Sequence, residues 1–370
     1  MSPGAVAAAG LAALAVGMGI GRFAFTPVLP LMQAEGALTL AGGGALATAN
    51  YAGYLAGALS APLVSSALGV RAGLAGVGIL TLGMALTEQF FLWVALRAAV
   101  GVASAWVLVH VSAWCLERLP VARPALAGAV YAGVGAGSMV AGMVCLVVLQ
   151  WHYAARDAWL ALGSMALASS ALLWPAFAQQ RRSARPARPM AWNRDSALLV
   201  LCYGAFGFGY IIPATFIPAY AREALGSAAL YAWAWPVFGA AAAASTVMAA
   251  ALARRLGERR VWIGGHLVMA AGVAAPLALP GMPGIVVCAL CVGATFMVIT
   301  MAGLREARKL GGAEVLAAMT AGFALGQIAG PAFVSLLARA GGRLEQASIA
   351  AGLALVASAF ALALSRRPEP

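Results

Sequence analysis

Charged side chains are scarce in this chain. Only 34 of the 370 residues are Asp, Glu, Lys or Arg, while 63% are hydrophobic. A soluble domain carries about 25% charged residues, so this chain has too few to form a solvated surface. Its apolar excess also excludes a disordered chain. We therefore predict an integral membrane protein, which the 44 glycines suit because small residues let membrane helices approach closely.

Patterns typical of metal or redox chemistry are also missing. The five cysteines form no disulfide framework, and the C-x-x-C at Cys288 and Cys291 lies in an apolar run without a second ligand pair. We predict that they pack, rather than bind metal or react, and expect no metal and no cofactor. The N-terminus lacks a basic segment and its first apolar run is of spanning length, which predicts a transmembrane helix instead of a cleaved signal peptide.

Apolar runs long enough to cross a bilayer recur along the chain. A spanning helix needs about 20 residues, because each residue rises about 1.5 Å across a hydrocarbon core of roughly 30 Å. Division at charges, prolines and glycines predicts twelve helices. They cover residues 5–32, 40–67, 72–88, 90–115, 125–149, 158–178, 196–220, 226–252, 261–280, 282–303, 313–337 and 345–365.

One polar stretch divides these helices into six and six. Residues 179–195 hold five arginines and two prolines and cannot span a membrane. We therefore predict an all-α membrane protein with an N-terminal six-helix bundle over residues 1–178 and a C-terminal one over 196–370. The stretch 179–195 is predicted to be a basic cytoplasmic linker.

Basic residues are distributed unevenly between the two sides of this topology. With the N-terminus inside, 17 of the 23 lie on the cytoplasmic side: Arg71, Arg118, Arg123, Arg181, Arg182, Arg185, Arg188, Arg194, Arg254, Arg255, Arg259, Arg260, Arg305, Arg308, Lys309, Arg366 and Arg367. Four lie outside, namely Arg156, Arg222, Arg339 and Arg343. This bias predicts both termini in the cytoplasm, a location in the cytoplasmic membrane, and contact of the basic residues with anionic lipids rather than nucleic acid.

The two halves share features that suggest an internal repeat. Gly19, Gly21 and Pro30 in the first predicted helix match Gly207, Gly209 and Pro218 in the seventh. The fifth and eleventh helices are similarly rich in glycine. Glycine and proline are common in such helices, so chance is the alternative explanation. Two parallel six-helix halves are typical of the major facilitator architecture.

Several segments carry a more specific resemblance. They are GIGRFAFTPVLPLMQ (19–33), ANYAGYLAG (49–57), YGAFGFGYIIPATFIPA (203–219), TFMVITMAGLREAR (295–308) and MTAGFALGQIAGP (319–331). Together they resemble the YbfB/YjiJ group of major facilitator superfamily transporters over nearly the whole chain. The resemblance implies a twelve-helix transporter of the inner membrane. The loop after the second helix departs from the superfamily pattern, since it retains only Arg71, which puts the usual gating charge pair in doubt.

Arg22 is the charge predicted to lie deepest in the membrane. A charge at the bilayer centre costs about 2.5–3.5 kcal/mol on insertion scales, so Arg22 should face the protein interior or water. We favour an anion-binding role in a central cavity. The alternative is a structural arginine bonded to carbonyl groups that Pro27 and Pro30 leave free.

Deep acidic residues are absent from the predicted spans. All acids within or beside the spans fall near helix ends, so Arg22 has no obvious counter-ion within the membrane. A buried carboxylate is the usual proton relay and the usual trap for a cationic substrate. A cavity with an arginine and no acid should prefer an anion.

Other polar and aromatic residues are weaker candidates for the site. Asn50 and Tyr54 share a face of the second helix and could contact substrate or bond between helices. The second half offers Tyr210, Thr215, Trp235 and Gln327. Seven further tryptophans near predicted helix ends are typical of the interfacial belt: Trp93, Trp114, Trp151, Trp159, Trp174, Trp192 and Trp262.

Three residues are candidates for gating or coupling. Arg97 begins an Arg-x-x-x-Gly pattern that is similar to one in the superfamily, with helix packing as its alternative role. His110 has the chemistry for proton coupling, although a lone membrane histidine is more often structural. Arg71 is the remaining charge of the gating loop. Protons are thus the candidate coupling ion.

We predict a secondary transporter that works by alternating access, is expected to be monomeric and is not an enzyme. The chain has no Walker-type loop, so an ion or substrate gradient must supply the energy. The expected substrate is a small organic anion. Efflux of amphiphilic or drug-like compounds is the alternative, and a membrane-embedded enzyme is a more distant one because no clustered catalytic set occurs.

Overall fold

All regular structure in the described residues is helical. The computed structural model describes residues 1–120, 123–178, 193–225, 232–310 and 313–365. The first part of the chain forms α1 (Pro3–Leu14), the π-helix η1 (Ala15–Phe23), α2 (Phe25–Ala34), α3 (Leu40–Ser60), η2 (Ala61–Leu63), α4 (Ser66–Gly83), α5 (Phe90–Arg118), α6 (Pro124–Gln150), α7 (Ala155–Leu173) and η3 (Trp174–Phe177). The second part forms α8 (Arg194–Leu225), α10 (Ala234–Leu256), α11 (Glu258–Ala278), α12 (Met282–Leu310), α13 (Ala313–Arg339) and α14 (Leu344–Leu364).

Ten helical segments in the described residues are long and apolar enough to cross a membrane, with α1, η1 and α2 counted as one. This confirms a multi-pass, all-α membrane protein. Two of the twelve predicted spans are not among the ten. α3 contains Thr48, Asn50 and Tyr51, which lower its hydropathy, and α10 contributes the shorter apolar segment Ala234–Ala249. The number twelve stays a prediction.

Several helix ends differ from the predicted ones. The second helix stops at Ser60 and the third starts at Ser66, because the short η2 turn lies between them. Residues 179–192 of the predicted linker lie outside the described residues. α8 then begins at Arg194, because Asn193 Oδ1 accepts a hydrogen bond from the Ser196 N–H at 2.8 Å and caps the helix.

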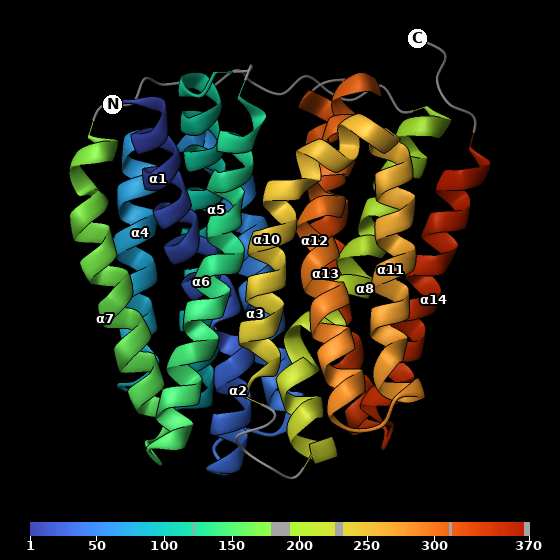
Figure 1. Ribbon diagram of the computed structural model, residues 1–370. Helices are drawn as coiled ribbons and strands as arrows, with labels where there is room; N and C mark the ends of the chain where they lie inside the picture. The colour runs from blue at the N-terminus through green and yellow to red at the C-terminus, as the bar shows by residue number, and fades with distance from the viewer. Residues whose placement is uncertain (121–122, 179–192, 226–231, 311–312, 366–370) are drawn as a thin grey trace.

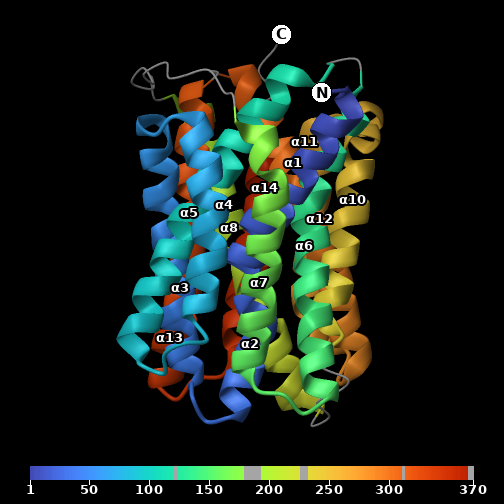
Figure 2. The same ribbon diagram turned by 90° about the vertical axis from the view of Figure 1, so that its left-hand side faces the viewer.

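The long helices run alternately up and down and form two groups that lie side by side (Figure 1). α1 begins and α14 ends at the same end of the molecule, which we call the proximal end; the opposite end is the distal end. The view turned by 90° places α7 in front of α2 and α6, at the edge of the first group (Figure 2). α6 packs on α10 and α3 packs on α13, and these two pairs join the groups.

The helix pairs within each group repeat along the chain. In the first group α1 packs on α6, α3 on α5 and α4 on α7. In the second group the corresponding pairs are α8 with α13, α10 with α12 and α11 with α14. The pairing of the first, second and third helices of each group is therefore the same.

Two arginines occupy equivalent positions in this repeated arrangement. Arg71 donates from Nε and Nη2 to the Trp174 carbonyl at 3.2 and 2.9 Å, and Arg259 donates in the same way to the Leu362 carbonyl at 3.1 and 3.0 Å. Each pair is 103 residues apart in the chain. Each arginine ties the start of the third helix of its group to the end of the sixth, where free carbonyls accept the bonds. Arg71 thus contacts its own helix group.

The tryptophans correct the belt prediction in part. Trp93, Trp114, Trp159 and Trp262 are buried inside the protein, whereas Trp151 and Trp174 are exposed. Trp192 lies outside the described residues. Position near a helix end did not decide exposure, because neighbouring helices cover these rings.

Candidate functional site

The helix that carries Arg22 changes its geometry around that residue. Residues Ala15–Phe23 form a π-helix between α1 and α2. π-Helical turns are rare and occur frequently at functional sites. Pro27 and Pro30, just beyond, lack the N–H groups that would bond earlier carbonyls.

Arg97 bonds to two carbonyl groups of this π-helix. It lies on α5 with 1% of its surface exposed and donates to the Gly21 and Arg22 carbonyls at 3.3 and 3.2 Å. Its guanidinium carbon is 5.1 Å from the centre of the Phe25 ring. The structural contact that was considered for Arg22 is therefore made by Arg97.

Asn50 connects α3 to the same region. Its Nδ2 donates to the Arg97 carbonyl at 2.9 Å, which is the helix-to-helix bond considered as its alternative role. Tyr51, the next residue, lies at the contact between the helix groups, where its hydroxyl is 3.2 Å from Thr215 Oγ1. Thr215 thus contacts the first helix group, in the distal half of α8.

Arg22 lies between the two helix groups. Its side chain is buried, with 3% exposure, and its Nη2 donates to Oε1 of the fully buried Gln327 on α13. The guanidinium carbon lies over the Tyr54 ring at 4.1 Å from its centre and over Tyr51 at 5.1 Å. Arg22 Nε has no hydrogen-bond partner. Cation–π contacts and one amide oxygen therefore compensate this charge.

Rings from the second helix group continue the wall of this site. Tyr210 stacks on Phe296 with 5.0 Å between ring centres, and Phe296 is 6.1 Å from Phe23. Trp235 is 6.4 Å from Phe23 and fully buried. It lies in the first turn of α10, which starts at Ala234, whereas the predicted helix started at residue 226. Residues 226–231 lie outside the described residues.

The described part of this cluster has more hydrogen-bond donors than acceptors. Arg22 Nε, Gln327 Nε2, Tyr210 Oη and Trp235 Nε1 are all buried without a partner. Buried polar groups are normally satisfied, so a group of orphaned donors indicates an acceptor-bearing ligand or water. The arrangement can bind a group with several acceptor oxygens beside an apolar or aromatic body.

Two predicted gating or coupling residues do not join this cluster. His110 lies on α5 and packs against Gly69 of α4, with its Nε2 unpartnered. Arg71 bonds to the Trp174 carbonyl at the start of η3, as described above. Neither takes part in the contacts found around Arg22. Their predicted roles stay predictions.

Two rings of the site, Phe23 and Phe296, were missed from the sequence. Phe23 directly follows Arg22 in the chain, so its position next to the predicted binding residue could have identified it as a candidate. Phe296 lies inside the segment 295–308 that carried the resemblance, but nothing in a single apolar helix shows which of its faces meets the site.

Acidic residues of the described chain lie away from Arg22. The four ion pairs found there involve Glu117, Glu258, Glu306 and Glu345, and none includes Arg22 or Arg97. In the described residues no group of three or more His, Cys, Asp or Glu side chains could hold a metal ion. Arg22 and Arg97 therefore have no carboxylate partner among these ion pairs.

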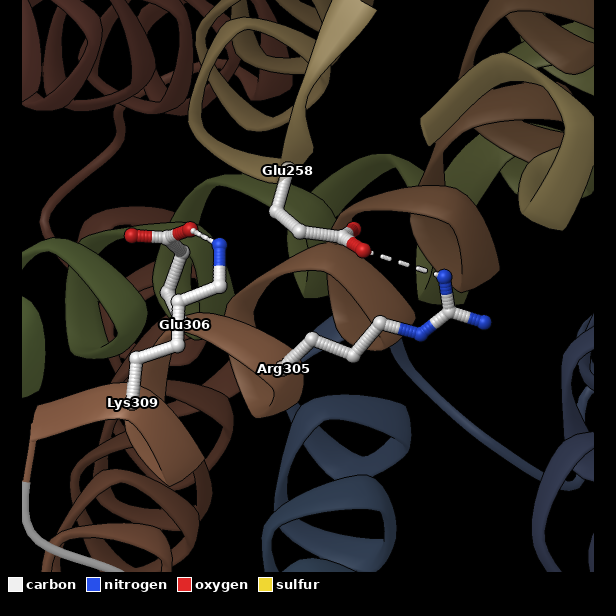
Figure 3. A network of polar contacts seen from close by, with 4 residues as sticks. All are labelled: Glu258, Arg305, Glu306 and Lys309. Atoms are coloured by element: carbon white, nitrogen blue, oxygen red, sulfur yellow. Dashed lines mark hydrogen bonds and ion pairs between the residues drawn. The ribbon is translucent and has the colours of Figure 1, made fainter. Parts of the chain in front are cut away.

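A separate charged cluster lies at the proximal end. Arg305 Nη1 is 3.1 Å from Glu258 Oε1, and Lys309 Nζ is 2.6 Å from Glu306 Oε1 (Figure 3). The first pair joins α11 to α12, and the second lies within α12. Ion pairs that link neighbouring elements at a helix end stabilise their relative position, modestly where water reaches them.

Arg97→Gln should destabilise the protein strongly. The substitution removes the two guanidinium bonds to the Gly21 and Arg22 carbonyls in a buried place. We expect a loss of about 2–4 kcal/mol in the free energy of unfolding. Thermal unfolding of the purified variant in detergent measures it. An unchanged melting temperature would contradict the bonding role of Arg97.

The helices, their spanning length and the buried arginine at the contact of two helix groups define a multi-pass membrane transporter of the major facilitator class. A family model described as "Uncharacterised MFS-type transporter YbfB" matches residues 14–363. The chain belongs to this family. No match was found among curated proteins.

Proposed function

We propose that the protein is a secondary active transporter of small organic anions, most directly monocarboxylates with an apolar or aromatic body. The observation that carries this proposal is the Nε–Nη2 edge of Arg22. Nη2 donates to the Gln327 oxygen and Nε has no partner. A carboxylate offers two oxygens in the spacing that a guanidinium edge binds with two parallel hydrogen bonds.

The site supports one negative charge rather than two. Arg22 is the cation of the cluster, and its wall consists of Tyr54, Tyr210, Trp235, Phe23 and Phe296. Buried charge is costly without compensation, so a second carboxylate would find no partner among these residues. The rings favour an apolar substrate body.

Alternating access is supported by the way the two helix groups meet. We propose that residues 1–178 and 196–370 rock as two six-helix bundles about the Arg22 site. The repeated helix pairing and the equivalent bonds of Arg71 and Arg259 support this division. Asn50 and Thr215 are proposed to position the site rather than to bind substrate, because each already has a polar partner.

The distribution of basic residues supports a membrane location and an orientation for the protein. We propose that the proximal end faces the cytoplasm of the cell and that the protein lies in the cytoplasmic membrane. Basic side chains there, including Arg255, Arg259 and Arg260, line a groove and favour contact with anionic lipid headgroups. A monomer remains the expected state.

Ligand-dependent thermal stability of the purified full chain tests the substrate class. We expect benzoate and phenylacetate to raise the melting temperature. At a ligand concentration a hundred times the dissociation constant, binding should add about 2.7 kcal/mol to the free energy of unfolding. Benzamide and benzylamine are matched neutral and cationic controls and should have no such effect. Succinate should stabilise less than benzoate.

Two results would contradict the proposal. Equal stabilisation by benzamide and benzoate would show that the charge of the ligand is not recognised. Stabilisation by benzylamine and larger amphiphiles alone would instead favour the efflux of amphiphilic compounds.

A further inference from the structure

Gln327 and a substrate carboxylate would compete for the same edge of Arg22. Nη2 already donates to Gln327 Oε1, and Nε on the same edge lacks an acceptor. A carboxylate that binds with two hydrogen bonds needs both nitrogens. Nη2 carries two N–H groups, but a carboxylate oxygen there would lie next to the Gln327 oxygen, and the two acceptors would repel each other. Arg22 thus has two competing partners, one from the protein and one from the substrate.

The amide of Gln327 suits both situations. Its oxygen accepts from Arg22 in the present arrangement, while its Nε2 is buried without a partner. After displacement, that N–H group can donate to a carboxylate oxygen. An amide carries both a donor and an acceptor, which neither a carboxylate nor an apolar side chain provides at neutral pH.

The Arg22–Gln327 bond also joins the two helix groups. Arg22 lies on η1 and Gln327 on α13. Distal to it, further bonds cross the same boundary: Ser335 Oγ donates to the Ala41 carbonyl at 2.9 Å, and Thr26 Oγ1 donates to the Ala214 carbonyl at 3.1 Å. The distal ends of the groups are therefore in contact while Gln327 holds Arg22.

A transporter that moves substrate in net terms must close around its site both with and without cargo. Closing around an unpaired arginine is unfavourable, because a buried charge without partners is strongly destabilising. A neutral acceptor from the opposite helix group removes this obstacle. It does so without binding Arg22 as strongly as a carboxylate would.

We propose that Gln327 replaces the substrate carboxylate on Arg22 during the unloaded half of the cycle, and that this allows net transport rather than exchange alone. This inference rests on the proposed function. Gln327 is thus a positioning residue for the return step. Gln327→Leu, which keeps the size but removes the acceptor, should lower net transport much more than exchange.

A cross-linking experiment tests the closing step without any substrate. Ala41→Cys and Ser335→Cys are introduced together after the five native cysteines are replaced by alanine, and a thiol oxidant is added to membranes. We expect a ready cross-link in this parent and a rate at least about fivefold lower with Gln327→Leu. Thr320→Ala on the same helix is the matched control, because its hydroxyl bonds only to the Leu316 carbonyl.

The cross-linking result can overturn the inference in two ways. An unchanged rate in Gln327→Leu would show that the amide is not needed for closure. Absence of a cross-link in the parent would show that the protein does not adopt the closed distal arrangement without substrate. Neither result depends on the identity of the substrate, so both are distinct from failure of the carboxylate proposal.

A flux experiment then tests the consequence for transport. Proteoliposomes are assayed with radiolabelled benzoate, once with buffer inside and once with unlabelled benzoate inside. We expect Gln327→Leu to lower both activities, because the variant also loses the Nε2 donor to the carboxylate, and to lower net uptake at least about tenfold more than exchange. Gln327→Glu should abolish both, because its carboxylate would pair permanently with Arg22. An equal loss of both activities in Gln327→Leu would overturn the inference.

Discussion

Arg22→Gln is expected to abolish binding and transport of benzoate while leaving the protein folded. The variant loses the guanidinium edge and the positive charge that contacts Tyr54 and Gln327, which should weaken binding at least about 100-fold, or about 3 kcal/mol. Arg22→Lys keeps the charge but not the two-donor edge, so it should retain weak binding. Thermal-shift titration and flux in proteoliposomes measure both variants.

The stability of Arg22→Gln separates a functional role from a structural one. Within the described residues, Arg22 is a buried charge with no ion pair and an unpartnered Nε, and unlike Arg97 it bonds no backbone carbonyl, so its removal relieves a desolvation cost. We therefore expect the melting temperature without ligand to stay the same or rise. Arg343→Gln is the control, because Arg343 forms an exposed pair with Glu345 at the distal end. Unchanged binding and flux in Arg22→Gln would refute the site; a large loss of stability would indicate a structural arginine instead.

Gly53→Ala and Gly101→Ala are expected to cause the largest loss of stability. A methyl group on Gly53 would overlap the Ala98 carbonyl oxygen, and one on Gly101 would overlap the Asn50 carbonyl oxygen. Both obstacles are backbone atoms, so α3 and α5 would have to separate. We expect a loss of about 3 kcal/mol or more for each variant, because such overlap exceeds ordinary overpacking.

Two other glycines are matched controls for this prediction. Gly264 on α11 and Gly352 on α14 are also helical, but a methyl group there meets no atom within 4 Å. Alanine at either position should be neutral or stabilise by about 0.5–1 kcal/mol. Thermal unfolding in detergent compares all four. Equal effects at the close and the open glycines would contradict the packing explanation.

The pair α3 and α5 also links stability to the site. Asn50 lies on α3 and Arg97 on α5, and Arg97 donates to the Gly21 and Arg22 carbonyls in η1. Separation of α3 from α5 would therefore move the support of Arg22. Variants at Gly53 and Gly101 should lose ligand binding together with stability.

Local patterns predicted the helices better than the contacts between them. The third predicted helix was displaced by several residues because its start depends on the η2 turn, whose residues are also apolar. Trp262 was assigned to the membrane interface from its place near a helix end, yet it is buried. In both cases the deciding interactions come from residues distant in the chain.

The roles of the two membrane arginines illustrate the same limit. Sequence reasoning placed both in the membrane and weighed substrate contact against carbonyl bonding for Arg22. Only the structure shows that Arg97 donates to those carbonyls, and that Gln327, 305 residues away, accepts from Arg22. No periodicity or spacing along one helix encodes a partner on another.

Composition and order along the chain determined the class of protein: hydropathy predicts multiple membrane-spanning helices, and the scarcity of acids predicts a site that favours anions. These properties follow from solvation, which each segment feels separately. Tertiary structure decided which polar groups meet, which rings surround Arg22 and which donors remain without partners. Hydrogen bonds and ring contacts act over a few ångströms, so they depend on how the helices pack against one another.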